Sequence, residues 1–559
     1  MIKKTLTILL FIAAIVAVYF ISGKYFFRLD LTSEKRYSIS DNTKKLLRGL
    51  DDEIVFKIYL DGDLNSGFLR LRKATREMLD EFSAYSRNLK YEFINPSAAS
   101  TPQAREKQYE ELAKRGIRGI MVHEKDKEGK SIQKMVFPWV EISYKGKNHL
   151  VNLLKNLPGK SGEENLNISI QNLEFELTEA IRLLTSKEIR KVAFIEGHGE
   201  LPEVLTYDIS QTLSRYYQVD RGVIGDDPAI LEPYSAIIIA APQEKFTEKD
   251  KYVIDQYIMR GGKALWMVDG TRVSLDSLSV YSETMAIPND VNLSDQLFKY
   301  GIRINPVLVL DVQSALIPVN VAEEGEPAKF EPMPWYYSPI LLTSPEHPVT
   351  RNLTPVKAEF ASSLDFVGED LPVKKDVLLI TSTGTRLQTT PSLVSMDIIN
   401  VEKSGHFFNT RNTIVAASIE GVFPSVFTNR MIPEGIRSQE KMITESKPTK
   451  MIVVANGSII RNDVQGYGEN TSIVPLGFDR YMNQQFGNKD FILNAVNYLT
   501  DDEGWMALRS REIKLRLLNK PAIIGLRKFW QISNVLLPLV FLALFGTVSY
   551  FVRKKRYAS

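Results

Sequence analysis

The stretch Lys191-Val192-Ala193-Phe194-Ile195-Glu196-Gly197-His198-Gly199-Glu200 begins the part of the chain that decides the fold. Its apolar residues predict a strand, and the two glycines that follow predict a tight turn. We expect a helix from about Val204 to Tyr217. The next segment, Ala236-Ile237-Ile238-Ile239-Ala240, is apolar throughout, which is typical of a strand buried on both faces.

The alternation of strands and helices continues beyond this segment. A helix is expected near Glu248–Arg260, ended by Gly261-Gly262, and the next strand is expected over Ala264–Asp269. Five alternating elements of this kind predict a doubly wound, mostly parallel sheet. Later elements are expected at Val307–Asp311, Val377–Thr381, Thr413–Ser418 and Met451–Ala455 for strands and at Asp490–Leu499 for a helix.

A smaller α/β domain is expected before Lys191. Strands at Ile54–Leu60 and Tyr91–Pro96 flank a helical pattern from Leu69 to Tyr85, which is the order of a βαβ unit. A helix near 103–115, three short strands up to Tyr144 and an amphipathic helix from Ile168 to Leu184 follow. The outline predicts a thioredoxin-like domain without its cysteine pair, so redox chemistry is excluded.

Both ends of the chain carry long uncharged runs. Thr5 to Ser22 is about 27 Å long as a helix, close to the thickness of a hydrocarbon core, and follows Lys3-Lys4. Aromatic residues stand where a cleavage site needs small ones, which favours an uncleaved anchor over a cleaved signal peptide. Phe529 to Val552 is the second run, followed by the basic cluster Arg553–Arg556, and a buried core helix is the weaker alternative.

The positive-inside rule places both basic ends in the cytoplasm and the bulk of the chain on the other side. We therefore expect a protein of the bacterial inner membrane with two spans and a large periplasmic body. Basic residues also flank the second span on its outer side and are expected to contact lipid headgroups. They are Arg516, Lys520, Arg527 and Lys528.

Composition excludes several classes of protein. With 44% apolar and 25% charged residues among 559, the chain is an ordinary globular mixture of two to four domains, rather than a polytopic membrane protein. A net charge of +3 gives no global basic field, so no nucleic-acid partner is expected. The absence of cysteine excludes disulfides, cysteine nucleophiles and cysteine-ligated metals.

His198 and Glu200 are the first candidate binding residues. They follow a strand at the edge where open α/β sheets bind ligands, and their side chains suit acid-base work or contact with a ligand or partner. A tight turn with solvated side chains is the alternative. No nucleophile is in view, so we predict no catalytic residues and no enzyme. No two of the five histidines have helical metal spacing, so no metal is expected, and no cofactor is expected because the phosphate-loop and dinucleotide patterns fail.

The aromatic group Trp335-Tyr336-Tyr337 is the second candidate site. It lies in a long polar insertion, 321–339, and a second insertion covers 430–450. Aromatic side chains stack on sugar faces or anchor protein interfaces, and the alternative is packing of the insertion against its own domain. No phosphate loop is predicted, because Leu154 stands where the first glycine before Gly159-Lys160-Ser161 is required.

Several segments together resemble the GldG family of gliding-motility ABC transporter auxiliary proteins. They are Leu31-Thr32 with Lys35–Ser40, the turn Gly197–Glu200, Asp255–Lys263, Tyr300–Asn305, Gly487–Asn494 and Phe529–Pro538, and their order covers almost the whole chain. The resemblance implies a non-catalytic, substrate-binding-like partner of an ABC permease and a separate cytoplasmic ATPase. It also implies a Rossmann-like domain related in fold to amidotransferases that lacks their catalytic cysteine.

The expected architecture is therefore two or more extracytoplasmic α/β domains between two terminal transmembrane helices. A glycan- or peptide-binding module of the cell envelope is the alternative function, and a hydrolase would need a nucleophile within reach of His198. The expected boundaries are 1–24 for the anchor, 25–186 for the small α/β domain, 187–505 for the Rossmann-like ABC-auxiliary domain, 506–528 for a membrane-proximal linker, 529–552 for the second transmembrane helix and 553–559 for a basic cytoplasmic tail.

Overall fold

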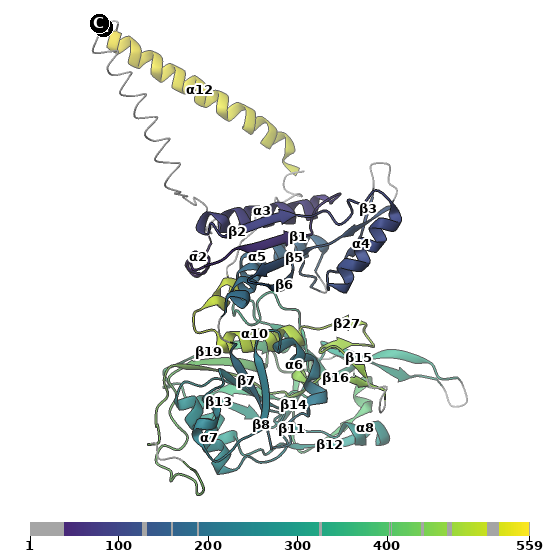
Figure 1. Cartoon of the computed structure of the whole chain (residues 1–559). Coiled ribbons are helices and arrows are strands. Elements are labelled where there is room, and N and C mark those ends of the chain that lie inside the picture. Colours follow the sequence, from purple (N-terminus) through teal and green to yellow (C-terminus); the bar gives the residue numbers. More distant parts are fainter. Residues whose placement is uncertain are drawn as a thin grey trace. The chain divides into compact units, whose positions relative to one another are not determined.

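The computed structural model is a mixed α/β protein with several sheets and one apolar C-terminal helix (Figure 1). It describes residues 39–557 except for 126–130, 158–159, 187–188, 323–326, 402, 404, 438–440, 467–471 and 511–524. The expected N-terminal span, residues 25–38 and most of the expected linker lie outside the described residues. The described residues up to Ser510 form one compact unit, and the C-terminal helix belongs to a second unit.

The first domain contains a four-stranded sheet in the order β2-β1-β5-β6. Strands β1 and β2 are parallel and are joined through α3, which confirms the predicted βαβ unit, and β5 runs antiparallel to β1. Helix α5 begins with a capping box between Ser161 and Glu164. The elements are α2 (Asp41–Arg48), β1 (Ile54–Ile58), α3 (Ser66–Tyr85), β2 (Leu89–Phe93), α4 (Pro102–Lys114), β3 (Ile120–Lys125), β4 (Ser131–Val136), β5 (Trp139–Tyr144), β6 (Lys147–Asn152) and α5 (Gly162–Thr185).

The central domain is built on a ten-stranded sheet, five strands of which are parallel in the order β8-β7-β9-β10-β23. The predicted strands at β7, β9, β10 and β23 and the helices α7 and α10 are confirmed. The parallel strands and the longer helices of the domain are β7 (Lys191–Glu196), α6 (Tyr207–Leu213), β8 (Gln218–Val223), β9 (Ala236–Ala240), α7 (Glu248–Met259), β10 (Ala264–Met267), β23 (Thr449–Val454) and α10 (Asn488–Thr500).

Strand β9 shows why the parallel half of the sheet is apolar throughout. Ala236, Ile238 and Ala240 belong to the core on one face, which includes residues of α10. Ile237 and Ile239 belong to the core on the other face, which includes residues of α7. Because successive side chains of a strand alternate between faces, a strand covered on both sides needs apolar residues at every position.

The other strands of the large sheet are antiparallel, so the prediction of a mostly parallel sheet is right for only half of it. Beyond β23 the order is β22, β19, β16 and β15, each antiparallel to its neighbour. Antiparallel neighbours do not need the helical crossover that joins parallel strands. The four strands that follow β23 are β15 (Ser314–Asn320), β16 (Phe330–Thr343), β19 (Val373–Ile380) and β22 (Ile414–Gly421). Strand β14 (Val307–Asp311) pairs with β20 (Thr385–Thr389) outside the large sheet.

The first predicted insertion, 321–339, is largely ordered as a strand. Strand β16 carries Pro332, Pro334 and Pro339, yet it pairs with β15 through this region. Prolines argue against a central strand, but over Pro332 and Pro334 β16 pairs with β15 alone, because β19 joins β16 only at Leu342 and Thr343. The hairpin of β15 and β16 is visible as a long projection from the central domain in Figure 1.

Shorter elements complete the part of the chain that follows Lys191. They are η1 (Glu203–Thr206), η2 (Pro228–Leu231), β11 (Thr271–Arg272), α8 (Leu275–Tyr281), β12 (Glu283–Pro288), α9 (Ser294–Tyr300), β13 (Ile302–Asn305), β17 (Val356–Lys357), β18 (Ser363–Phe366), β21 (Ser392–Ser395), η3 (Met396–Asn400), η4 (Ser458–Ile460), β24 (Val464–Gln465), β25 (Ser472–Ile473), β26 (Phe478–Asp479), β27 (Gln484–Gln485) and η6 (Trp505–Ser510).

Helix α12 (Arg527–Tyr557) is the second unit. Its stretch Arg527–Lys555 is 29 residues long with a mean hydropathy of 2.3, and none of it is buried. It is the one helix among the described residues that is long and apolar enough to cross a membrane. The apolar C-terminal span predicted from Phe529 to Val552 lies within this helix.

Candidate functional site

The turn after β7 is shaped by its two glycines. Gly197 has φ of 111° and Gly199 has φ of 69°, and L-residues with a side chain rarely adopt these angles. A Cβ atom at Gly199 would also lie 3.2 Å from Cβ of Gln243. Backbone amides of Gln243 and Glu244 both donate to the carbonyl oxygen of His198 at 2.8 Å, so the turn is fastened to the segment after β9.

His198 is buried at the centre of this turn and is 4% exposed. Its Nδ1 lies 3.0 Å from Oε1 of Glu200, its Nε2 lies 3.2 Å from Oδ2 of Asp250, and its ring stacks on Phe246 with centroids 3.6 Å apart. Burial by itself lowers the pKa of His198, but the hydrogen bonds to Asp250 and Glu200 outweigh it and raise the pKa to about 9. The imidazolium therefore donates to both carboxylates and ties the turn to the start of α7.

A cavity of about 280 Å³ opens beside this turn, where the carboxyl ends of the parallel strands meet. We call it the strand-end cavity. Open α/β sheets bind ligands at this edge, because the loops that follow the strands converge there. Its lining comes from the segments after β7, β9, β10, β17 and β23 and includes Glu200, Ala241, Asp269, Arg272, Glu359, Gly457, Ser458 and Arg461.

Asp269 follows β10 and lies at the floor of the strand-end cavity. Its Oδ1 accepts a hydrogen bond from the backbone amide of Gly457 at 2.7 Å and another from Nδ2 of Asn456 at 3.3 Å. Burial raises the pKa of the Asp269 carboxyl to about 6, although these two donors and the nearby Arg461 act in the opposite direction. Asp269 is thus a buried carboxyl with a raised pKa beside a cavity.

Ala241 occupies the position immediately after β9 and also lines the strand-end cavity. Its φ is 55°, a left-handed conformation that is uncommon for a residue other than glycine. Nucleophiles of many α/β enzymes sit on a sharp strand-to-helix turn of this kind. Here the side chain is a methyl group, which supplies no nucleophile at this turn.

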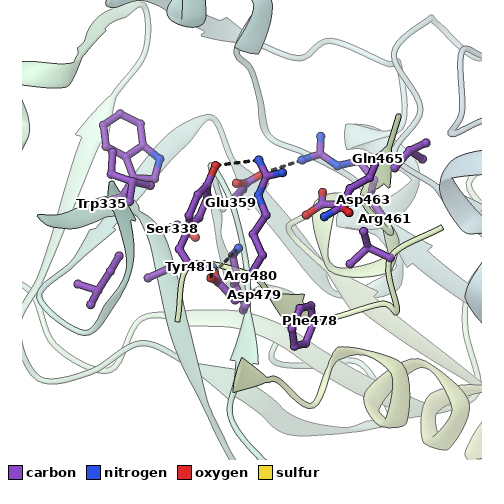
Figure 2. A pocket seen from close by; sticks show the side chains of 16 residues that line it. Trp335, Ser338, Glu359, Arg461, Asp463, Gln465, Phe478, Asp479, Arg480 and Tyr481 are labelled. Carbon is purple, nitrogen blue, oxygen red and sulfur yellow. Dashed lines mark hydrogen bonds and ion pairs between the residues drawn. The ribbon is translucent and has the colours of Figure 1, made fainter. Parts of the chain in front are cut away.

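A second cavity of about 330 Å³ lies beside the first, and the two share Glu359 and Arg461. We call it the hairpin cavity, because β15, β16 and the small hairpins β24–β25 and β26–β27 contribute to its lining. Figure 2 shows Trp335 on one side and Asp463 and Gln465 on the other. Arg480 and Tyr481 lie between them in this view.

Two ion pairs line the hairpin cavity. Nζ of Lys357 lies 2.7 Å from Oδ2 of Asp479, whose side chain is 1% exposed. A guanidinium nitrogen of Arg461 lies 2.6 Å from Oε2 of Glu359. Asp479 also accepts the backbone amides of Tyr481 and Met482 at 2.9 Å, so its carboxylate holds the turn that presents Tyr481.

The five predicted site residues fall in different places. Glu200 lines the strand-end cavity but its carboxylate is engaged with His198, which is buried. Trp335 lines the hairpin cavity, but like Tyr336 and Tyr337 it is buried in an aromatic core with Phe360 and Phe408. A binding role for these residues stays a prediction.

Sequence reasoning missed most of the residues that line the two cavities. Glu359, Arg461 and Tyr481 come from segments without a motif, and only the fold brings them together. Asp269 carried one usable signal, since it ends a buried strand at the ligand-binding edge of the sheet. Among the described residues, no group of three or more histidine, aspartate or glutamate side chains is placed to hold a metal ion.

Comparison with known proteins identifies the family to which this chain belongs. Residues 190–495, more than half of the chain, match the family described as an ABC-type uncharacterized transport system, and the chain belongs to this ABC transporter auxiliary family. Residues 33–143 match a domain of unknown function.

Two individual proteins are similar to this chain. An uncharacterized protein of Borreliella burgdorferi is 21% identical over 544 residues, which cover 95% of this chain and 94% of that protein. Among solved structures, the mmIFT52 N-terminal domain is 15% identical with a TM-score of 0.31, covering 56% of this chain and 99% of that one.

Proposed function

We propose that the chain is a membrane-anchored extracytoplasmic subunit of an ABC transport complex linked to gliding motility. Its partners in this proposal are a permease and a separate cytoplasmic ATPase. Membership of the ABC auxiliary family supports the accessory role. The observation that carries the proposal is helix α12, an apolar helix joined to a large α/β body.

The dimensions of α12 support a membrane span. Its 29-residue apolar stretch is about 43 Å long at 1.5 Å per residue, which exceeds the roughly 30 Å hydrocarbon core and allows for tilt. Trp530 lies near one end and Tyr550 near the other, as in an aromatic belt, and Pro538 is tolerated within membrane helices. Large apolar side chains along the helix, such as Phe541, are exposed, and an apolar surface of this extent supports contact with a membrane.

The charges at the end of α12 support an orientation. Arg553, Lys554 and Lys555 close the helix, and basic residues favour the cytoplasmic side. Together with an N-terminal span, this orientation would put the described body in the periplasm and the protein in the inner membrane, and we propose this location. Arg527 and Lys528 at the other end then lie at the height of lipid headgroups.

A binding role is proposed for the body, in place of catalysis. The turn after β9, where many α/β enzymes carry a nucleophile, holds Ala241, which has no reactive side chain. The imidazole of His198 is hydrogen-bonded to the carboxylates of Glu200 and Asp250 inside the protein. The small domain, with strand order β2-β1-β5-β6, is proposed to be thioredoxin-like, and the central domain Rossmann-like and related to amidotransferases. In the transport complex, these domains recognise a ligand or respond to the state of the permease while the ATPase supplies the energy.

Copurification tests this proposal. A tagged full-length chain, extracted in mild detergent, is expected to bring down an ABC permease and an ATPase, identified by mass spectrometry. A chain ending at Ser510 should lose both, and a chain whose α12 is replaced by an unrelated single-span helix separates anchoring from specific packing. Equal recovery of both partners by the chain ending at Ser510 would refute the role given to α12.

Orientation is tested separately by protease added outside spheroplasts. The proposal expects cleavage within the described body, with α12 and its basic end protected. Complete protection of the body would overturn the periplasmic location.

A further inference from the structure

We propose that the hairpin cavity is a binding site for a neutral saccharide. This inference goes beyond the proposed transport function and does not depend on it. It starts from the balance of charge in the cavity, whose ionisable lining consists of Lys357, Arg461, Arg480, Glu359, Asp463 and Asp479. Three basic and three acidic groups leave no net charge to attract an ion.

The ion pairs disfavour a charged ligand further. Lys357 is committed to the buried Asp479, and Arg461 is committed to Glu359. A ligand anion bound to Lys357 or Arg461 would have to draw that group away from its partner and leave a buried or half-buried carboxylate without compensation, which is costly. The remaining charged groups of the lining, Arg480 and Asp463, are of opposite sign. A neutral ligand leaves both pairs in place.

Hydroxyl groups fit the polar part of the lining. An ion pair still offers N–H donors and carboxylate lone pairs at its rim, and a sugar hydroxyl both donates and accepts. Asp463 and Gln465 are exposed at the cavity and have side chains suited to adjacent hydroxyls. Hydrogen bonds to charged groups are stronger than those between neutral groups, which favours a polyhydroxylated ligand over an apolar one.

Aromatic side chains supply the other half of a saccharide site. Tyr481 is 52% exposed, and its hydroxyl accepts a hydrogen bond from Arg480 at 2.7 Å. The same guanidinium lies 4.8 Å from the ring centroid, so the tyrosine is held by two contacts. Trp335 also lines the cavity but is only 5% exposed, so Tyr481 provides the exposed aromatic face. Aromatic faces attract the weakly positive C–H groups of a sugar ring.

The size of the cavity limits the ligand. At about 330 Å³, it lies at the low end of the range of roughly 300–1,000 Å³ typical of small-molecule sites. This volume suits a short saccharide segment of about one or two rings. The strand-end cavity continues from it past Glu359 and Arg461 and offers room for a further ring.

Calorimetric titration of the full-length chain in a sugar-free detergent tests the inference. The probes are maltotriose, cellotriose and triacetylchitotriose, with triglycine as the peptide probe. We expect at least one saccharide to bind with Kd below about 1 mM, a weak affinity typical of a small open site. Tyr481→Ala should raise that Kd at least tenfold, and Asp463→Ala should raise it as well.

A matched control uses Tyr281, another exposed tyrosine of the central domain that does not line either cavity. Tyr281→Ala should leave the Kd unchanged. Absence of binding by all three saccharides, or equal affinity of the wild-type chain and Tyr481→Ala, would overturn the proposal. Binding of triglycine in place of the saccharides would assign the cavity to polypeptide and overturn it too.

Discussion

Replacing His198 by glutamine should remove a stabilising contribution that depends on pH. Glutamine keeps a polar side chain of similar reach but carries no charge between Glu200 and Asp250. The pKa of His198 is about 9 in the folded protein against 6.5 for an ordinary histidine. This difference corresponds to about 3 kcal/mol, at 1.36 kcal/mol per pKa unit.

The direction of the effect follows from proton binding. Below about pH 6.5 both the folded and the unfolded chain hold the proton, and the full contribution is present. Between about pH 6.5 and 9 the unfolded chain loses the proton while the folded chain keeps it, so stability falls as pH rises. Above about pH 9 the contribution is lost.

Thermal unfolding of the central domain measures this effect. The Tm of the wild-type chain should exceed that of His198→Gln at about pH 6. This difference in Tm should become smaller by about 5 °C when the pH is raised to about 10. His406→Gln, which replaces an exposed histidine of the same domain, is the control and should show no narrowing. A difference in Tm between the wild-type chain and His198→Gln that stays constant over this pH range would refute the stabilising role of the protonated His198 between Glu200 and Asp250.

Two further substitutions test the packing around the site. Gly457→Ala places a Cβ atom 2.2 Å from Cβ of Ala241 and 2.8 Å from Oδ2 of Asp269, so it should lower the free energy of unfolding by about 1–3 kcal/mol. The control is Gly222→Ala, which has open space around its Cβ and should leave the Tm nearly unchanged. Asp255→Ala removes the acceptor of three buried donors, the hydroxyls of Tyr300 and Ser425 and the amide of Val426, so it should lower the free energy of unfolding by about 3 kcal/mol or more. Chemical denaturation measures this loss, and the control Asp370→Ala, at an exposed position, should change the free energy of unfolding little. A similar loss for both variants would contradict this account.

Pattern alone predicted the elements whose burial is complete. Strands β9 and β10 and helix α7 were predicted from apolar runs and from Gly261-Gly262, because a strand covered on both faces tolerates few polar residues. The apolar C-terminal helix was equally visible, since length and hydropathy suffice to recognise a helix that could cross a membrane. The partly exposed strands β8, β12 and β15 were not predicted, because their mixed side chains carry no clear period.

Local sequence also gave the turn Gly197–Glu200 but not the role of its side chains. Whether His198 faces solvent, a ligand or a carboxylate depends on Asp250, which lies 52 residues further along the chain. The burial of Trp335, Tyr336 and Tyr337 likewise depends on partners such as Phe360 and Phe408. Contacts between distant segments leave no trace in local periodicity.

The sequence by itself therefore determined the α/β alternation, the buried parallel strands and the apolar C-terminal helix, since each depends on residues that are neighbours in the chain. The tertiary structure alone decided that Glu359, Arg461 and Tyr481 meet around one cavity. It also decided that His198 is clamped inside the protein. Both outcomes depend on which loops the sheet order brings to one edge, and that order is set by packing of the whole domain.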